Sequence, residues 1–134
     1  MYLLDTVSFS EFFKRRQHPG FVRWIGDKTE DMLFISALTI GEIERGIEAQ
    51  RGRDPIFSEA LLAWLGRSME GYGDRILPIT TPIARRWGRL SARIGHSGVD
   101  LLIAATALQH GFVVATRNVR HFEPTGVRVE NPFT

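Results

Sequence analysis

Apolar residues along this chain of 134 residues follow two patterns, and their alternation predicts the architecture. Short unbroken apolar runs fit strands that are covered on both faces, as in parallel sheets. Longer stretches with an apolar residue at every third or fourth position fit helices with one buried face. Pro78 suits a strand at the sheet edge or a strand end. Strands are predicted at 2–5, 32–35, 76–79, 112–115 and 127–130.

Local signals mark where the predicted helices begin and end. Ser8 with Glu11 three residues later matches a capping box, and Pro19 suits the first turn of a helix. Gly111 fits the left-handed residue that ends a central helix, which is apolar over most of its surface. Helices are therefore predicted after Ser8, His18, Ser36, Asp54 and Thr81, at 98–110, and as a single turn at 119–123.

Strands alternate with helices almost throughout, which predicts an α/β protein with three α/β/α layers around a mostly parallel sheet. The length suits a single domain, residues 1–134, with one core. A hydrophobic content of 43% and a charged content of 24% separate the chain from disordered proteins. Since the chain has no cysteine and shows neither a signal peptide nor a membrane span, we expect a cytoplasmic protein that does not bind membranes.

Four polar residues are predicted to meet at one edge of the sheet. Asp5 ends the first strand, Asn118 follows the strand at 112–115, and Glu42 and Asp100 open helices. In such a sheet, ligands bind beyond the carboxyl ends of the strands. Three carboxylates in one cleft repel each other unless a cation lies among them. Oxygen ligands, without cysteine or a histidine pair, favour Mg²⁺ or Mn²⁺ over Zn²⁺.

Helix capping is the alternative explanation for these acids. Thr39 precedes Glu42 by three residues and Ser97 precedes Asp100 by three, so both pairs match capping boxes. An acid in a first helical turn is also stabilised by the helix dipole. Spacing alone favours capping for Glu42 and Asp100, while for Asp5 a turn-starting role and a functional role are equally supported.

Charge adds a second candidate surface. The net charge is only +2, but all cations except Lys14 and Lys28 are arginine, which suits bidentate contact with phosphate. Arg85, Arg89 and Arg93 follow one side of a predicted helix. A solvated helix face is the favoured interpretation, with a phosphate-binding surface as the alternative. The histidines show no ligand spacing and are expected at the surface or in caps: His18, His96, His110 and His121.

Several segments taken together resemble one known family. They are 1–6, reading MYLLDT; 36–43, reading SALTIGEI, with Gly46 and Ile47; 100–107, reading DLLIAATA; 115–122, reading ATRNVRHF; and the tail from Gly126 to Phe133. In order and spacing these segments resemble the PIN-domain toxins of bacterial toxin–antitoxin modules, of the VapC/FitB type. The resemblance implies an α/β/α domain and a Mg²⁺- or Mn²⁺-dependent ribonuclease. It also implies a homodimer, a cognate antitoxin that blocks the site, and contact with operator DNA only through that antitoxin.

The resemblance also assigns roles to residues. Asp5, Glu42 and Asp100 match the three acids with which the family holds metal. Asn118 stands where many members have a fourth acid and others have asparagine. With these four as the catalytic set, the expected contacts to RNA come from their neighbours in the matching motifs, Thr6, Thr116 and Arg117.

One departure from the family pattern keeps other functions open. The family commonly reads Asp-Thr-Asn near its start, and here Val7 replaces the asparagine that usually supports the site. A non-catalytic protein that acts with its antitoxin as a repressor on operator DNA is therefore the main alternative. A phosphatase with an aspartate nucleophile would need a second acid two residues after Asp5, where Val7 stands.

Overall fold

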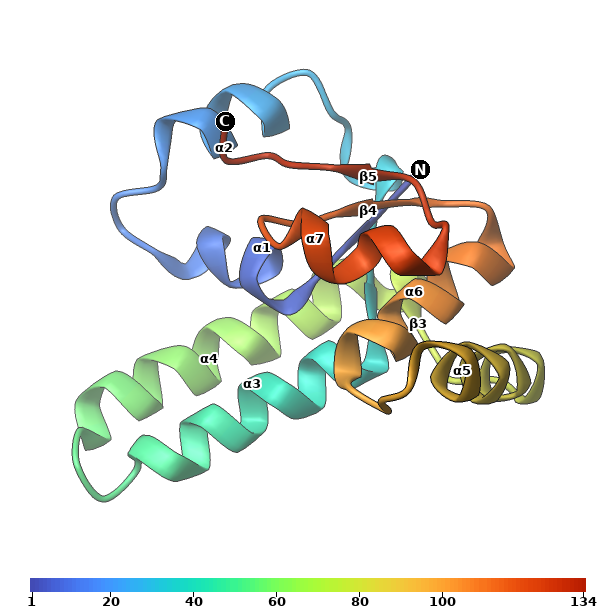
Figure 1. The fold of residues 1–134 in the computed structure, drawn as a ribbon. Coiled ribbons are helices and arrows are strands. Elements are labelled where there is room, and N and C mark those ends of the chain that lie inside the picture. Colours follow the sequence, from blue (N-terminus) through green and yellow to red (C-terminus); the bar gives the residue numbers. More distant parts are fainter.

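Five parallel strands form one sheet at the centre of the computed structural model, which describes residues 1–134. The order is β3-β2-β1-β4-β5, and each neighbouring pair is parallel (Figure 1). All five predicted strands are present, although most are shorter than predicted. β3 lies at the sheet edge, as expected, but ends at Leu77 and does not include Pro78. The strands are β1 (Tyr2–Leu4), β2 (Leu33–Ser36), β3 (Ile76–Leu77), β4 (Val113–Ala115) and β5 (Val129–Glu130).

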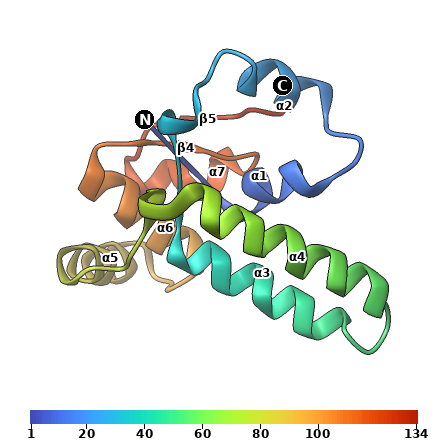
Figure 2. The same cartoon turned by 180° about the vertical axis from the view of Figure 1, so that it is seen from behind.

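Helices connect the strands and cover both faces of the sheet. α3 and α4 lie side by side as an antiparallel pair that extends from the body of the molecule (Figures 1 and 2). The helices are α1 (Thr6–Ser10), α2 (Pro19–Ile25), α3 (Ala37–Gln50), α4 (Pro55–Tyr72), α5 (Thr81–Ile94), α6 (Val99–His110) and α7 (Val119–Phe122), with short 3₁₀ turns η1 (Glu11–Phe13), η2 (Glu30–Met32), η3 (Gly73–Arg75) and η4 (Glu123–Thr125).

Two clusters of buried side chains, one on each face, make the three layers. Successive residues of a strand point to opposite faces, so Leu3 and Leu4 enter different clusters. Leu3 packs with residues of α6 and α7, and Leu4 packs with residues of α1, α3 and α4. A smaller cluster joins α5 to the outer side of α6. The predicted α/β/α architecture with a parallel sheet is confirmed.

α6 is the most buried helix, as its sequence predicted. Leu101 and the run Ile103–Ala107 are buried, because the helix lies between the sheet and α5. Gly111 ends α6 with φ 71°, a left-handed conformation that glycine adopts without steric cost.

Two predicted caps are wrong. Ser8 lies inside α1 rather than before it, and its hydroxyl donates to the Ala115 carbonyl at 2.9 Å. Thr80, not Thr81, caps α5. In each case the prediction placed the cap one or more residues too late, because several nearby polar residues could satisfy the same local pattern.

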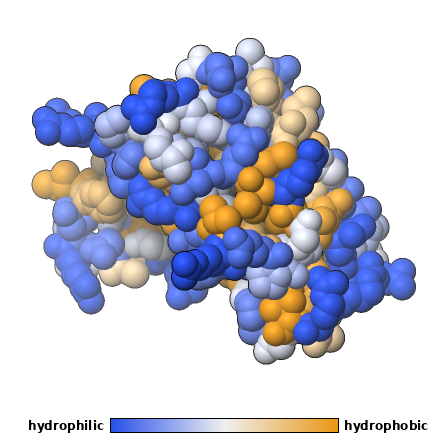
Figure 3. Space-filling model, turned by 45° about the horizontal axis from the view of Figure 1, so that its top comes forward, coloured by the Kyte–Doolittle hydropathy of each residue, from blue (hydrophilic) through white to orange (hydrophobic).

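The surface is mainly polar on the side shown in Figure 3, where hydrophobic side chains gather in patches between hydrophilic ones. No helix of the protein has both the length and the apolar character needed to cross a bilayer.

Candidate active site

The strand order reverses between β1 and β4. From β1 the chain continues to β2 on one side, whereas β4 is followed by β5 on the other side. Helices that leave neighbouring strands in opposite directions open a crevice at the carboxyl ends, where α/β proteins bind ligands. Asp5 directly follows β1, and Thr116 directly follows β4. The topology therefore brings these two side chains together.

Asp5 is a buried carboxylate with a full set of short contacts but no cation. The residue is only 3% exposed. Oδ1 accepts the backbone N–H of Ser8 at 2.9 Å, and Oδ2 accepts the Thr116 hydroxyl at 2.7 Å. Burial raises the pKa of Asp5, the charge of Asp100 raises it further, and the bonds from Thr116 and Ser8 lower it, with a net increase.

The same residue also starts a turn. Asp5 is the N-cap of α1, through its bond from Ser8. The turn-starting role considered for Asp5 is therefore present. It uses only Oδ1, which accepts the Ser8 backbone N–H. None of the protein's ion pairs involves Asp5.

Asp100 lies in the first turn of α6 and does not form a capping box. Gly98 is the N-cap, and no side chain caps this helix. Asp100 Oδ2 instead lies 2.9 Å from Nδ1 of His121, which comes from α7. The Asp100 side chain is one-third exposed, and its negative charge contributes to the raised pKa of the buried Asp5.

Glu42 likewise has no capping role. Ser36 caps α3, since its Oγ accepts the Leu38 N–H at 3.0 Å, and Thr39 is buried inside the helix. The Glu42 carboxylate accepts a hydrogen bond from the Thr6 hydroxyl. Thr6 Oγ1 also lies 3.2 Å from Thr39 Oγ1. Thr6, which was predicted to contact RNA, thus holds Glu42 in this structure.

The segment after β4 supplies the remaining predicted residues. Thr116 is fully buried, and its hydroxyl both donates to Asp5 and accepts the Asn118 backbone N–H at 2.9 Å. The Asn118 residue is exposed and its side chain does not cap α7. Arg117 is also exposed, and its guanidinium carbon lies 4.0 Å from the centre of the Phe133 ring.

The donor chemistry of the crevice fits a hard divalent cation. Its carboxylates offer oxygen only, and Asp5 is buried without a positive partner. No three acidic or histidine side chains converge on one point in the arrangement described here. Glu42 is hydrogen-bonded to Thr6 and forms no recorded contact with Asp5 or Asp100, so its role as a third ligand stays a prediction.

The contact between His121 and Asp100 was not predicted from the sequence. The proximity of His121 to Asn118 in the chain was the only local signal, because the partner residue Asp100 lies 21 positions earlier. The sheet topology, rather than any spacing, brings α6 and α7 together at this edge.

Comparison with known proteins places this geometry in a family. The PIN domain model matches residues 2–126. The chain belongs to the PIN domain family. The VapC ribonuclease Y4jK of Sinorhizobium fredii is 34% identical, over 99% of this chain and 98% of that protein. Toxin FitB of Neisseria gonorrhoeae is 28% identical, over 99% of each.

A solved structure supports the same assignment for this PIN protein. The structure of FitAB bound to an IR36 DNA fragment superposes with a TM-score of 0.86 at 28% identity, covering 100% of this chain and 96% of that one. The predicted membership among VapC/FitB-type PIN proteins is therefore confirmed, and so is the predicted fold.

Proposed function

We propose that this PIN protein is the toxin of a toxin–antitoxin pair and a Mg²⁺- or Mn²⁺-dependent endoribonuclease of the cytoplasm. The observation that carries the proposal is Asp5, a buried carboxylate at the strand-order reversal that has Asp100 nearby and no cationic partner. Burying unpaired negative charge is unfavourable, and a divalent cation bound there would offset that cost. The ribonuclease named among the relatives supports RNA as the substrate.

Each residue of the crevice then has a distinct task. Asp5 and Asp100 would hold the ion, Thr116 would fix Asp5 through its hydroxyl, and His121 would orient Asp100. Glu42, which accepts the Thr6 hydroxyl, would be the third acid to hold the ion. Asn118 offers an exposed amide beside them. A bound Mg²⁺ or Mn²⁺ would supply a water of lowered pKa and offset charge on the phosphate.

A separate pocket supports the antitoxin as a partner. It has a volume of about 410 Å³ and lies between α1, the end of α2 and α4, and none of the proposed site residues lines it. Aromatic and aliphatic side chains form most of its wall, and Lys28, Arg75 and Glu30 add charges of both signs. Such a surface suits an antitoxin segment with apolar side chains.

The outer faces of α3 and α5 support a homodimer. α5 exposes Ala84 and Gly88 beside Arg85 and Arg89, and neither arginine has an acidic partner. Glu44 is exposed on α3 without an ion pair. Small residues allow close helix approach, so α5 of one copy suits α3 of another. Dimers would then combine with antitoxin in a larger complex that reaches operator DNA through the antitoxin.

The proposal is tested with purified protein and a single-stranded RNA. Cleavage should require Mg²⁺ or Mn²⁺ and should stop with EDTA, and the cleaved RNA should carry a 5′-phosphate on one product. Undiminished cleavage in excess EDTA would contradict the metal-dependent mechanism.

A catalytically inactive repressor component is the second candidate function. Val7 favours it, because this residue is 44% exposed and offers no polar group beside Asp5. The DNA in the FitAB structure is consistent with such a role for that relative. Protein that binds antitoxin and operator DNA but cleaves no RNA with Mn²⁺ would support this alternative.

A further inference from the structure

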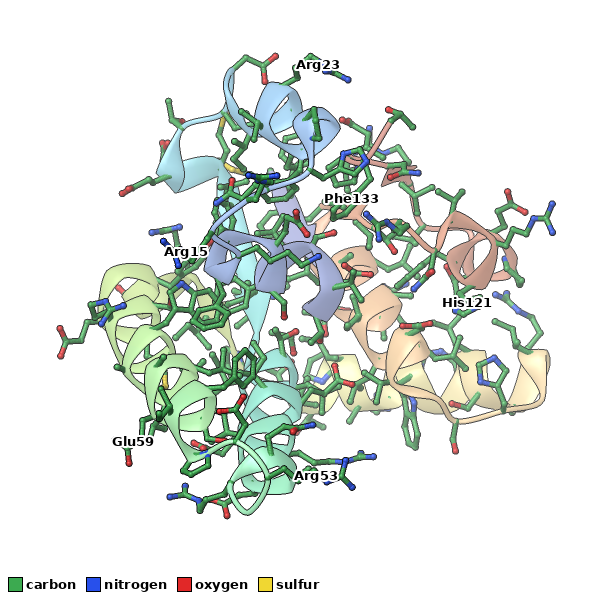
Figure 4. All side chains as sticks on the ribbon, turned by 90° about the vertical axis from the view of Figure 1, so that its left-hand side faces the viewer. Arg15, Arg23, Arg53, Glu59, His121 and Phe133 are labelled. Carbon is green, nitrogen blue, oxygen red and sulfur yellow. The ribbon has the colours of Figure 1, made fainter.

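The C-terminal tail, which the proposed function leaves without a role, is fastened to the rest of the protein close to the crevice. Phe133 is 8% exposed and stacks on Phe21, with ring centroids 5.5 Å apart and an angle of 28°. Its N–H donates to the Asn131 side chain at 2.9 Å. The terminal Thr134 carbonyl accepts a hydrogen bond from Arg23 at 3.2 Å. Figure 4 shows Phe133 between α2, which carries Arg23, and α7, which carries His121.

The Phe133 ring also contacts the Arg117 guanidinium. Its central carbon lies 4.0 Å from the ring centre, within the range of a favourable cation–π contact. Arg117 follows Thr116, which is bonded to Asp5, and precedes Asn118. The cation is therefore fixed one residue away from the buried part of the crevice.

This kind of contact leaves the arginine able to bind an anion. The guanidinium forms no ion pair and no hydrogen bond with another protein group. The contact with the ring restrains the position of the guanidinium and uses none of its N–H donors, which lie in the plane of that group. A planar cation held in one place with free donors is suited to bidentate contact with phosphate.

Glu11 does not neutralise the arginine, because it has partners of its own. Glu11 is buried, accepts the His18 N–H at 2.7 Å and pairs with Lys14 at 3.0 Å. The positive charge of Arg117 also acts on the Glu11 carboxylate, although the two groups form no direct ion pair.

We infer that Phe133 is a positioning residue, which holds Arg117 so that its guanidinium binds an RNA phosphate next to the scissile one. The inference rests on the proposed function for the substrate class only. It assigns the C-terminal tail to substrate binding and places Arg117, rather than Thr6, as the principal polar contact to RNA.

Binding without metal tests this role separately from catalysis. A fluorescently labelled single-stranded RNA is titrated with full-length protein in EDTA at several salt concentrations. Arg117→Gln should weaken binding and reduce the slope of log K against log salt by about 0.7, the contribution of one phosphate contact on a single strand. Arg67→Gln, an exposed arginine of α4, is the charge-matched control and should leave the slope unchanged.

Phe133→Leu should weaken binding by about two- to fivefold, the size of one exposed cation–π contact, with the salt slope retained because the charge remains. Phe133→Trp preserves an aromatic face and should restore binding. Gly20→Ala should behave as Phe133→Leu, since a Cβ there would lie 2.4 Å from the Thr134 carbonyl oxygen and displace the tail. In cleavage assays Phe133→Leu and Gly20→Ala should raise KM with little change in kcat.

Two results would overturn the inference. One is an unchanged salt slope in Arg117→Gln. The other is a Phe133→Leu effect that is as large in the Arg117→Gln background as in wild type, since the ring would then act through the fold alone. Wild-type protein that binds RNA with the expected slope but never cleaves it would contradict the nuclease and not the positioning of Arg117.

Discussion

Two buried acids flank α1, Asp5 before its first residue and Glu11 after its last, and they differ in whether a cation lies nearby. Asp5 is 3% exposed and Glu11 is 2% exposed. Burial acts to raise the pKa of Glu11, but the His18 N–H, Lys14 and Arg117 together hold it below its usual range. Asp5 has no cation, and its pKa is raised. Burial alone therefore does not distinguish the two acids; the presence or absence of a positive partner does.

The largest expected effect comes from removing the acid that lacks a cation. Asp5→Asn should lower Mn²⁺-dependent RNA cleavage by about a hundredfold or more, since even indirect contacts to a metal reach that size. The amide keeps an oxygen that can accept the Ser8 N–H, so the fold should persist. Cleavage rates and circular dichroism of the same preparation provide the measurement. A variant that cleaves at the wild-type rate would remove Asp5 from the proposed site.

Glu11→Gln should have the opposite profile. Gln can still accept the His18 N–H but loses the charge that pairs with Lys14, so we expect a loss of about 1–2 kcal/mol in unfolding free energy. Cleavage per folded molecule should stay close to wild type. Urea unfolding and cleavage at a temperature where both proteins are folded would separate the two effects. Equal losses of cleavage in Glu11→Gln and Asp5→Asn would erase the distinction between the two acids.

Asp100→Asn should change the response to metal more than the stability itself. Asp100 raises the pKa of Asp5 by charge repulsion, so neutralising it should leave the metal-free protein at least as stable as wild type. Millimolar Mn²⁺ should raise the melting temperature of wild type by binding the folded state, and should do little for the variant. Thermal melting in EDTA and in Mn²⁺ tests both statements. A variant that melts lower in EDTA but responds fully to Mn²⁺ would indicate a helix-terminal charge effect only.

The smallest expected effect is a difference in pH dependence between the two acids. The pKa of Glu11 is lowered on folding from 4.5, so its stabilising contribution is present above that value and is lost as pH falls through the folded pKa. The pKa of Asp5 is raised on folding from 3.8, so its contribution becomes unfavourable as pH rises from 3.8 through the folded pKa. Unfolding free energies in EDTA, compared between wild type and each Gln or Asn variant across this acidic window, should show slopes of opposite sign.

The sequence predicted those features that depend on runs of apolar residues. The central helix α6 and the strand β4 are recognisable because α6 has an almost continuous buried stretch from Leu101 to Ala107 and β4 is a short apolar run. The capping boxes failed for a different reason. Thr39 and Ser97 stand at the right spacing, but the N-caps are Ser36 and Gly98. The spacing of a polar residue and an acid does not by itself show which residue begins the helix.

Local sequence patterns could not predict the contacts within the site, because the residues involved are far apart in the chain. Thr6 and Glu42 are 36 positions apart, and Asp5 and Thr116 are 111 apart. Their pairing follows from the order of the strands, which short apolar runs do not specify. The family resemblance identified the acids, whereas the partners that hold them, Thr6, Thr116 and His121, became visible only in the folded arrangement.

The two outermost strands have a consequence for self-association through the sheet. β3 and β5 each contain two residues, and Pro78 and Pro132 follow shortly after them. A short strand offers few unpaired N–H and C=O groups, and proline offers no N–H at all. The folded protein therefore presents little template on which another chain could add a strand, so copies that lack a bound partner have little tendency to assemble edge to edge into aggregates.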